Sequence, residues 1–293
     1  MTALADRGNR TESPGATMTQ LFQRAASDWL SLRQNADRRA RAAAAPLISI
    51  LNEHFRATSE VEVFDLGAGS GANLAWLAPQ ISLPQRWTLI DRDADLLAAA
   101  QSVETPDRVL SVRTQQRSID ELTAEELQST DLITASAVLD ILSVTQLDRL
   151  AALILEARVP ALLSLSVTGV VELSPALFID EEITDAFNQH QRRSGLAGPD
   201  AAHYLCEQLR LAGAEVKTIE TPWNLGGGAD DDQLQDVALL ERYLTERVAA
   251  ATEQRPHLID IANAWLSART AQVRQHSLTV RVDHIDLLVL PTS

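Results

Sequence analysis

Cysteine is nearly absent from this sequence, with Cys206 alone among 293 residues. One cysteine excludes an internal disulfide and a cysteine-based zinc site, so we expect no metal and a cytoplasmic, reducing setting. No apolar run reaches the roughly 20 residues that a membrane-spanning helix requires, and we therefore expect no membrane partner. The N-terminus also lacks the continuous apolar segment of a secretory signal.

Positive charge is also scarce, since 25 Lys and Arg residues stand against 40 Asp and Glu residues, a net charge of −15. Such an acidic chain has no broad attraction for phosphate backbones, which disfavours nucleic acid as a partner. Lys217 is the only lysine, so a Schiff-base nucleophile is excluded at almost every position. The first 56 residues contain 8 arginines, which we interpret as part of a solvated helical face.

From Val61 onward, short β-branched runs alternate with helical stretches. This alternation is typical of a parallel sheet covered by helices on both faces. The expected fold is α/β, with a seven-stranded, mostly parallel, doubly wound Rossmann-like sheet. We predict strands at residues 62–66, 87–90, 108–113, 132–135, 161–167, 215–220 and 284–290.

Composition divides the chain into three parts. We expect a disordered polar tail over residues 1–18, an N-terminal helical cap over 19–56, and the Rossmann-like domain over 57–293. Two insertions, at about 170–194 and 225–277, interrupt the domain, and the second has the pattern of two helices before the last strand. Insertions of this length are commonly lids or binding elements. A helical buttress or a homodimer contact through the helical segments is an equal alternative.

The most specific motif is DLGAGSG, Asp65 to Gly71, directly after the apolar run VEVF. A buried strand there enters a glycine-rich turn that opens a helix. Glycine permits the sharp turn and the close approach of a ligand, and the free N–H groups at the helix start attract polar or anionic groups. We therefore predict a ligand site at the C-terminal edge of the first strand, at a switch point of the sheet.

Asp91 ends the next strand, 20 residues after the last glycine of the motif. An acidic side chain there can accept hydrogen bonds from both hydroxyls of a ribose. The glycines alone leave two cofactor classes open, because Gly67, Gly69 and Ala72 also fit the dinucleotide pattern G-x-G-x-x-A. Three features argue against a dinucleotide. Asp65, an acidic residue, stands before the first glycine, and the glycines have the spacing G-x-G-x-G. The chain also ends with two strands that a long segment separates.

These residues resemble the class I S-adenosylmethionine-dependent methyltransferase family, over residues 61–167 and more weakly over 198–220 and 284–291. The resemblance implies an S-adenosylmethionine-dependent methyltransferase with S-adenosyl-L-methionine as cofactor. It implies that Asp65 holds the loop or the amino-acid ammonium, that Asp91 binds the ribose hydroxyls, and that Arg92 lies beside the adenine. The implied cofactor-binding residues are Asp65, Gly67, Ala68, Gly69, Ser70, Gly71, Asp91, Arg92, Gln116, Ser118, Ile119 and Ser136.

Adenine recognition is the least defined of these roles. The family often has an acidic residue after the third strand, whereas this chain has TQQRSID over residues 114–120. Our candidates there are Gln116, Ser118 and Ile119.

The acceptor is expected beside the segment TASAVLD, residues 134–140, where the fourth strand ends. Asp140 is a candidate substrate contact or catalytic base, and a helix cap is the equal alternative. The segment AFNQHQRR in the first insertion supplies His190 as a second candidate base, because an imidazole titrates near neutrality. Further substrate contacts are predicted at Asn188, Gln191, Arg193 and Trp223. A polar helix face and a core tryptophan are the structural alternatives.

The leading hypothesis is methyl transfer to a small-molecule acceptor by in-line displacement, in which the protein supplies proximity, alignment and a dry pocket. No serine elbow, P-loop or HExxH motif argues for another chemistry, and the Asn/Asp-Pro-Pro-aromatic signature of many nucleic-acid methyltransferases is absent. Two alternatives stay open: an NAD-dependent oxidoreductase, and a non-catalytic cofactor-binding member of the same fold.

Overall fold

The computed structural model describes residues 27–226 and 231–291. Its sheet has the strand order β3-β2-β1-β4-β5-β8-β6, and β7 pairs with β8 beside this path. Strand β8 runs antiparallel to its neighbours, and the pairs among β1 to β5 are parallel. The strands are β1 (Val61–Leu66), β2 (Gln85–Asp91), β3 (Val109–Gln116), β4 (Leu132–Ser136), β5 (Ala161–Ser174), β6 (Glu215–Glu220), β7 (Trp223–Gly226) and β8 (Thr279–Leu290).

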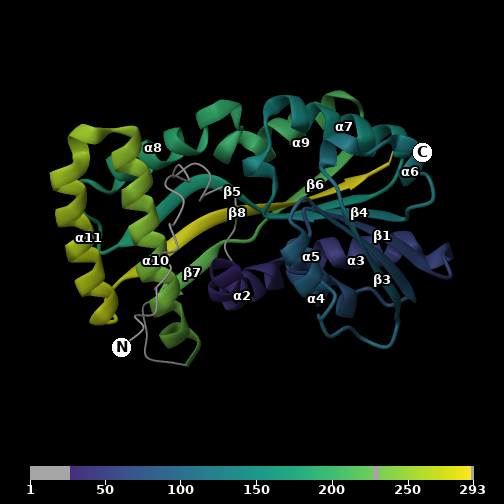
Figure 1. Ribbon diagram of the computed structural model, residues 1–293, viewed down its shortest axis with the longest axis horizontal. Coiled ribbons are helices and arrows are strands. Elements are labelled where there is room, and N and C mark those ends of the chain that lie inside the picture. Colours follow the sequence, from purple (N-terminus) through teal and green to yellow (C-terminus); the bar gives the residue numbers. More distant parts are fainter. Residues whose placement is uncertain (1–26, 227–230, 292–293) are drawn as a thin grey trace, which may run out of the picture.

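Helices cover both faces of this sheet (Figure 1). On one face α3 and α4 pack on β1 through a cluster that includes Leu51, Val63 and Leu74. On the other face α7 and α9 pack through a cluster that includes Leu150 and Leu205. The helices outside the second insertion are α2 (Ser27–Arg41), α3 (Ala45–His54), α4 (Ala72–Leu77), α5 (Ala94–Ala100), α6 (Ala124–Leu127), α7 (Val144–Ala157), α8 (Asp180–Gln191) and α9 (Ala201–Leu211).

Strands β5 and β8 are longer than the sheet around them. Only residues 161–164 of β5 pair with β4, whereas its pairing with β8 continues to Ser174. The far ends of β5 and β8, together with β7, carry helices α8, α10 (Asp231–Gln254) and α11 (Ile259–Arg274). We call this part the helical lobe, and it forms one end of the molecule (Figure 1). It has its own apolar core, which includes Ile183, Leu244 and Trp265.

The strand β5 is irregular where it leaves the sheet. Its register with β8 shifts between Leu163 and Ser166, and Leu165 has a positive φ of 53°. The backbone N–H of Leu165 donates to the buried carboxyl of Asp286 at 2.8 Å. This bulge turns the strand from the sheet toward the lobe, and it places the lobe beside the C-terminal ends of the parallel strands.

The expected Rossmann-like fold is confirmed, with seven strands at the predicted places and two helices in the second insertion. Two details differ. An eighth strand, β7, occupies the start of the expected second insertion, and β5 continues through residues 170–174, which were expected in the first insertion. Both segments form strands because they pair with β8, which is distant in the sequence, and the local pattern of residues does not predict this pairing. The predicted tail, residues 1–18, lies outside the described residues. No helix of the described chain is long and apolar enough to cross a membrane.

Candidate cofactor and acceptor site

The glycine loop lies at the C-terminal end of β1, where the strand order reverses between β1 and β4. Gly67 and Gly69 both have positive φ, which favours glycine. A Cβ on Gly67 would lie 2.5 Å from a methyl carbon of Val138, whereas a Cβ on Gly69 would have its nearest neighbour, in Leu30, at 3.8 Å. Gly67 is therefore required by packing, whereas a Cβ on Gly69 would make an ordinary van der Waals contact. The loop residues Ala68, Ser70 and Gly71 complete the turn into α4.

Asp91 ties the end of β2 to this loop. One carboxylate oxygen accepts the N–H of Gly69 at 2.9 Å, and the other accepts the N–H of Asp93 at 2.9 Å. Each carboxylate oxygen has a further lone pair for a ligand. Arg92 is exposed beside it, and its carbonyl accepts the side-chain amide of Gln116 at 3.2 Å. The structure therefore brings Gly69, Asp91, Arg92 and Gln116 to one edge.

The other two adenine candidates have structural partners. Ser118 caps a short 3-10 helix, Ile119–Glu121, by accepting the N–H of Asp120. Ile119 packs in the core with 9% of its surface exposed. These contacts neither support nor contradict a role of Ser118 or Ile119 in adenine binding.

Asp65 is fully buried at the end of β1. The amide of Asn73 donates to one of its oxygens at 2.8 Å and to the hydroxyl of Thr134 at 3.0 Å. The other oxygen of Asp65 has no hydrogen-bond partner among the described residues. Burial raises the pKa of Asp65 to about 7, against the bond from Asn73 and the nearby charge of Arg41, which lower it.

Arg41, the last residue of α2, reaches the same place from the N-terminal segment. Its guanidinium donates to the carbonyl of Ala72 at 3.3 Å and to the hydroxyl of Ser136 at 2.5 Å, and it lies 4.8 Å over the Trp76 ring. It is 4% exposed, and its Nε lacks a partner in the described chain. Burial lowers its pKa. The interpretation of the N-terminal arginines as a solvated face is therefore wrong for Arg41.

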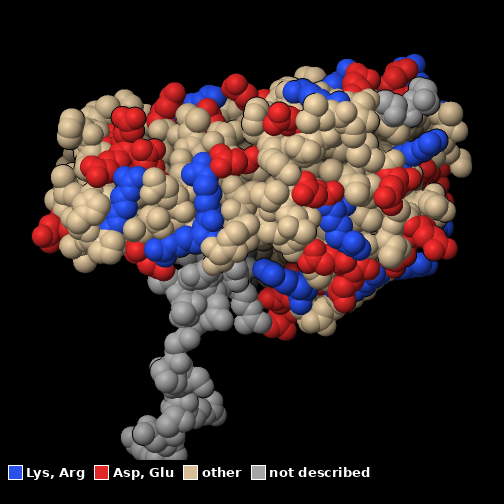
Figure 2. All heavy atoms as spheres, turned by 90° about the horizontal axis from the view of Figure 1, so that it is seen from above, with Lys and Arg blue, Asp and Glu red and all other residues tan. Residues whose placement is uncertain are grey.

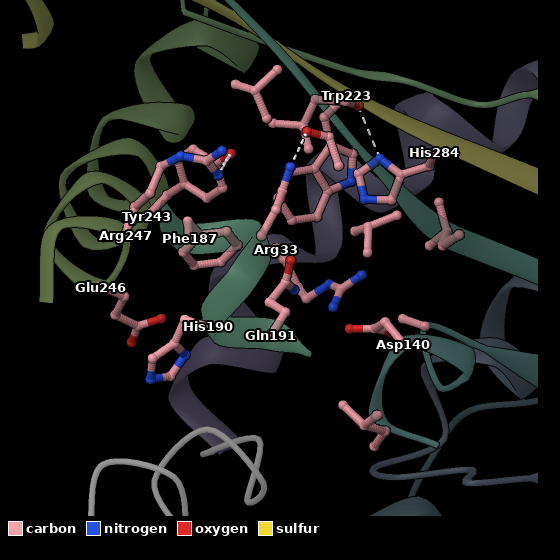
Figure 3. Close-up of a pocket in the computed structure, with 18 of the residues that line it drawn as sticks. Arg33, Asp140, Phe187, His190, Gln191, Trp223, Tyr243, Glu246, Arg247 and His284 are labelled. Carbon is pink, nitrogen blue, oxygen red and sulfur yellow. Dashed lines mark hydrogen bonds between the residues drawn. The ribbon is translucent and has the colours of Figure 1, made fainter. Parts of the chain in front are cut away.

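A cavity of about 220 Å³ lies between the sheet edge and the helical lobe (Figure 3). Its walls come from α2, the segment after β4, β5, α8, β7, α10 and β8. All six residues predicted on the acceptor side line it: Asp140, Asn188, His190, Gln191, Arg193 and Trp223. The structure therefore gathers in one cavity residues that are up to 83 positions apart in the sequence.

Several of these polar groups already have protein partners. Nε2 of His190 lies 3.1 Å from a carboxylate oxygen of Glu253, and Arg193 donates to the other oxygen at 2.5 Å. The amide of Asn188 donates to the carbonyl of Gly169 at 2.9 Å. The indole N–H of Trp223 donates to Asp37 at 3.0 Å. These contacts orient the cavity wall.

Asp140 differs from them, because no side chain of the described residues pairs with its carboxylate at ion-pair distance. Burial raises the pKa of Asp140 to about 6, and Arg33 opposes this shift through its charge. Figure 3 shows the carboxylate directed into the cavity, toward Arg33. A carboxyl with this pKa is mostly ionised at neutral pH and can accept a proton there.

His284 of β8 lines the cavity and was not predicted from the sequence. Its Nδ1 lies 3.0 Å from the carbonyl of Val282, which can only accept, so Nδ1 carries a proton and a neutral ring would offer Nε2 as an acceptor. Burial lowers its pKa to about 4, so the ring is neutral near pH 7. The ring packs against Trp223 with centroids 5.0 Å apart.

Sequence reasoning also missed the residues that α2 and α10 contribute, namely Trp29, Arg33, Tyr243, Glu246 and Arg247. One signal was available: Arg247 interrupts the apolar face that Leu244 and Val248 form on α10. An arginine within such a face is unusual unless it has a partner or a ligand.

Residues 63–160 match the family model described as a methyltransferase domain. No curated protein matches the chain by sequence. Similar solved structures include a cyclopropane synthase from Mycobacterium tuberculosis (12% identity, 84% of this chain and 83% of that chain, TM-score 0.41). A second is a phospholethanolamine N-methyltransferase from Haemonchus contortus (12% identity, 96% of this chain and 62% of that chain, TM-score 0.44). A third is a small RNA methyltransferase (15% identity, 64% of this chain and 24% of that chain, TM-score 0.40).

The family match confirms the resemblance that the glycine loop and Asp91 suggested. Residues 63–160, about a third of the chain, match a methyltransferase domain. The match favours methyl transfer over the NAD-dependent alternative.

Proposed function

We propose that this protein methylates a small-molecule acceptor, by in-line displacement, in the cavity between the sheet edge and the helical lobe. One observation carries the proposal: a cavity of about 220 Å³, lined mostly by apolar and aromatic side chains, begins at Ala137 and Asp140, directly after β4. In an open α/β sheet, ligands bind at this carboxyl edge of the strands. A cavity of this size admits a small molecule or a single side chain.

S-adenosylmethionine supplies an electrophilic methyl group when it is bound. The glycine loop would line its methionine and ribose parts, and Asp91 would accept the ribose hydroxyls. The unpartnered oxygen of Asp65 and the unpartnered Nε of Arg41 fit the ammonium and the carboxylate of an amino acid. Arg92 and Gln116 would lie beside the adenine, and Ser118, Ile119 and Ser136 stay proposed cofactor contacts.

Asp140 is the proton acceptor that the cavity supports best. Its carboxylate lines the cavity beside the end of β4, and no side chain of the described residues forms an ion pair with it. His190 is the second candidate, although its Nε2 contacts Glu253. Asn188, Gln191, Arg193 and Trp223 would shape the acceptor site around them.

A nucleic-acid acceptor is disfavoured by the net charge of −15. On the face in Figure 2, acidic and basic side chains are interspersed and form no continuous basic surface. The single cysteine, Cys206, is free and buried, and the cytoplasmic setting stays a proposal. A homodimer through the helical segments stays a prediction, which light scattering in solution would test.

Calorimetry with S-adenosylmethionine and S-adenosylhomocysteine tests the cofactor site, with NADH as the control ligand and Asp91→Ala as the variant. We expect binding of both sulfur compounds, a large loss in the variant, and no binding of NADH. Turnover of a metabolite pool with isotope-labelled methyl donor then tests for a small acceptor. Labelled protein or RNA without a labelled small product would contradict the proposal, and binding without any turnover would support the non-catalytic alternative.

A further inference from the structure

The charged side chains that line the cavity fall into two groups. Most have a partner of opposite charge within the protein. Arg33 bonds Asp37, Arg193 bonds Glu253, and Glu246 bonds Arg242. Two have no ion pair among the described residues, the carboxylate of Asp140 and the guanidinium of Arg247. They come from different walls of the cavity, Asp140 beside β4 and Arg247 in α10 (Figure 3).

Arg247 is a buried cation without a counterion. It is 2% exposed, and its one hydrogen bond within the described chain is to the hydroxyl of Tyr243 at 2.7 Å. Its Nε and Nη2 have no partner there. The ring centroids of Phe187 and Tyr243 lie 4.4 Å and 5.4 Å from its Cζ. These aromatic rings stabilise the guanidinium, and its edge with Nε and Nη2 is unpaired. A buried charge left in this state destabilises the folded protein.

Arg269 in α11 shows how the same lobe treats a cation that serves only the fold. It is fully buried, and its Nη2 lies 2.5 Å from both carboxylate oxygens of Asp180. Its Nη1 donates to the carbonyl of Pro175 and to Gln272. The lobe therefore provides a carboxylate for the arginine behind the cavity and none for the arginine that lines the cavity.

The unpaired edge of Arg247 has the geometry of a carboxylate site. Nε–H and one N–H of Nη2 point in the same direction, and this pair of donors matches the two oxygens of a carboxylate. The rest of the cavity wall contains Trp29, Phe187 and Trp223, which suit an aromatic or apolar body. A molecule anchored at Arg247 would extend past these rings toward Asp140.

We propose that Arg247, with Tyr243, binds the carboxylate of a small aromatic acid, and that this acid is the methyl acceptor, with its nucleophilic end beside Asp140. The inference rests on the proposed function, since it names the chemical class of the acceptor. The step it implies is balanced: the hydroxyl or amine of the acid forms a bond to the methyl carbon, the bond from carbon to the sulfonium breaks, and the displaced proton passes to Asp140.

Calorimetry with four aromatic acids and their carboxamides tests this site. The acids are benzoate, para-hydroxybenzoate, para-hydroxyphenylacetate and para-hydroxyphenylpropionate, each with and without S-adenosylhomocysteine. We expect at least one acid to bind about tenfold or more tightly than its amide. Arg247→Met should remove this preference and Arg247→Lys should restore part of it, because a charged hydrogen bond contributes at least about a tenfold factor. Arg274→Met, at an exposed arginine of the lobe, is the control.

Thermal unfolding of the free protein is the second measurement. Arg247→Met should unfold at the same or a higher temperature than the natural protein, since it removes an uncompensated buried charge. A binding loss with a retained melting temperature identifies a ligand residue, and a lower melting temperature would assign Arg247 to the fold. Failure of every acid to bind at millimolar concentration, or equal binding of acid and amide, would overturn the inference.

The two proposals fail separately in this design. Binding of S-adenosylhomocysteine without any acid binding overturns the aromatic-acid acceptor and leaves the methyl-transfer site. Acid binding without any S-adenosylhomocysteine binding leaves the carboxylate site and contradicts the cofactor site.

Discussion

The glycine loop and the cavity behind it are assembled over very different distances along the chain. At the loop, Asp91 bonds Gly69, which is 22 residues away, and Asn73 bonds Asp65, which is 8 residues away. The cavity instead joins residues from Trp29 to His284. The loop is therefore a local structure that one motif encodes, whereas the cavity depends on the bulge in β5 and on the docking of the helical lobe.

The two regions also treat charge differently. At the loop, the carboxylate of Asp91 accepts two backbone N–H groups, so the protein itself orients it. In the cavity, Asp140 and Arg247 lack partners of opposite charge in the described chain. A group that is held by the backbone is ready to orient a fixed cofactor. A charged group without such a partner gains an ion pair only when a ligand supplies it.

The largest expected effect contrasts the two buried arginines of the lobe. Arg269→Met should lower the free energy of unfolding by about 3–5 kcal/mol, because it leaves the carboxylate of Asp180 without its cation. Arg247→Met should leave this free energy unchanged or raise it. Urea denaturation of both variants measures the contrast, with Arg274→Met as the exposed control. Equal losses in the two variants would show that Arg247 is a structural residue.

Asp91→Ala should weaken binding of S-adenosylhomocysteine by about 3 kcal/mol, roughly a 100-fold rise in the dissociation constant, because charged hydrogen bonds contribute about 1.5–3 kcal/mol each. Calorimetry checks this value. Binding of aromatic acids in the absence of cofactor should be unchanged, since the cavity is built by other elements. A parallel loss of acid binding would show that the loop and the cavity are not independent.

Asp140→Asn should lower kcat/KM by about 100-fold without removing cofactor binding, as expected for loss of a general base. Because the pKa of Asp140 is about 6, its carboxylate is protonated below this pH and ionised above it. The activity of the natural enzyme should therefore rise with pH through about 6 and then level off. The asparagine variant should lose this rise. An unchanged pH profile would assign the proton to another group, with His190 next to be tested.

The smallest effect concerns Asp286, at the bulge where β5 turns toward the lobe. Burial raises its pKa to about 6, so the ionised form is disfavoured in the folded state. Its contribution to stability is complete below the ordinary pKa near 4 and is lost as the pH rises through 6. Asp286→Asn keeps an oxygen for Leu165 and Thr221. It should raise the free energy of unfolding by about 1–3 kcal/mol near pH 8.

Near pH 5 the same substitution should change the stability much less, since Asp286 is then mostly protonated. Urea titrations at pH 5 and at pH 8 distinguish an effect of the charge of Asp286 from an effect of its packing. A loss of stability at both would mean that the second carboxyl oxygen has a structural role.

Much of the sheet was predictable because β1, β2 and β4 contain short runs of apolar residues that are buried, whereas β3, at the sheet edge, has no buried residue. The start of β5 and the final β8 were found for the same reason. The extension of β5 was not found, because it depends on pairing with the remote β8 and includes Gly169. The short β7 owes its existence to pairing with β8, about 55 residues later in the chain.

The site divides in the same way. Asp65, Asp91 and the glycines could be found because a motif with fixed spacing encodes them. Asn188, His190 and Trp223 were predicted from polarity or position, and they line the cavity, although several are bonded to the protein. Arg41 and His284 were not found, since their neighbours at the site come from distant parts of the chain.

The sequence by itself determined the fold class, the switch point and the cofactor loop, because strand burial, glycine conformation and the spacing to Asp91 are local properties. Only the tertiary structure decided which charges are compensated. The sequence does not show which residue will pair with a given arginine. Arg269 and Arg247 differ because helix α8 places Asp180 beside Arg269 and Phe187 beside Arg247. Whether a buried charge belongs to the fold or to a ligand is therefore settled by packing.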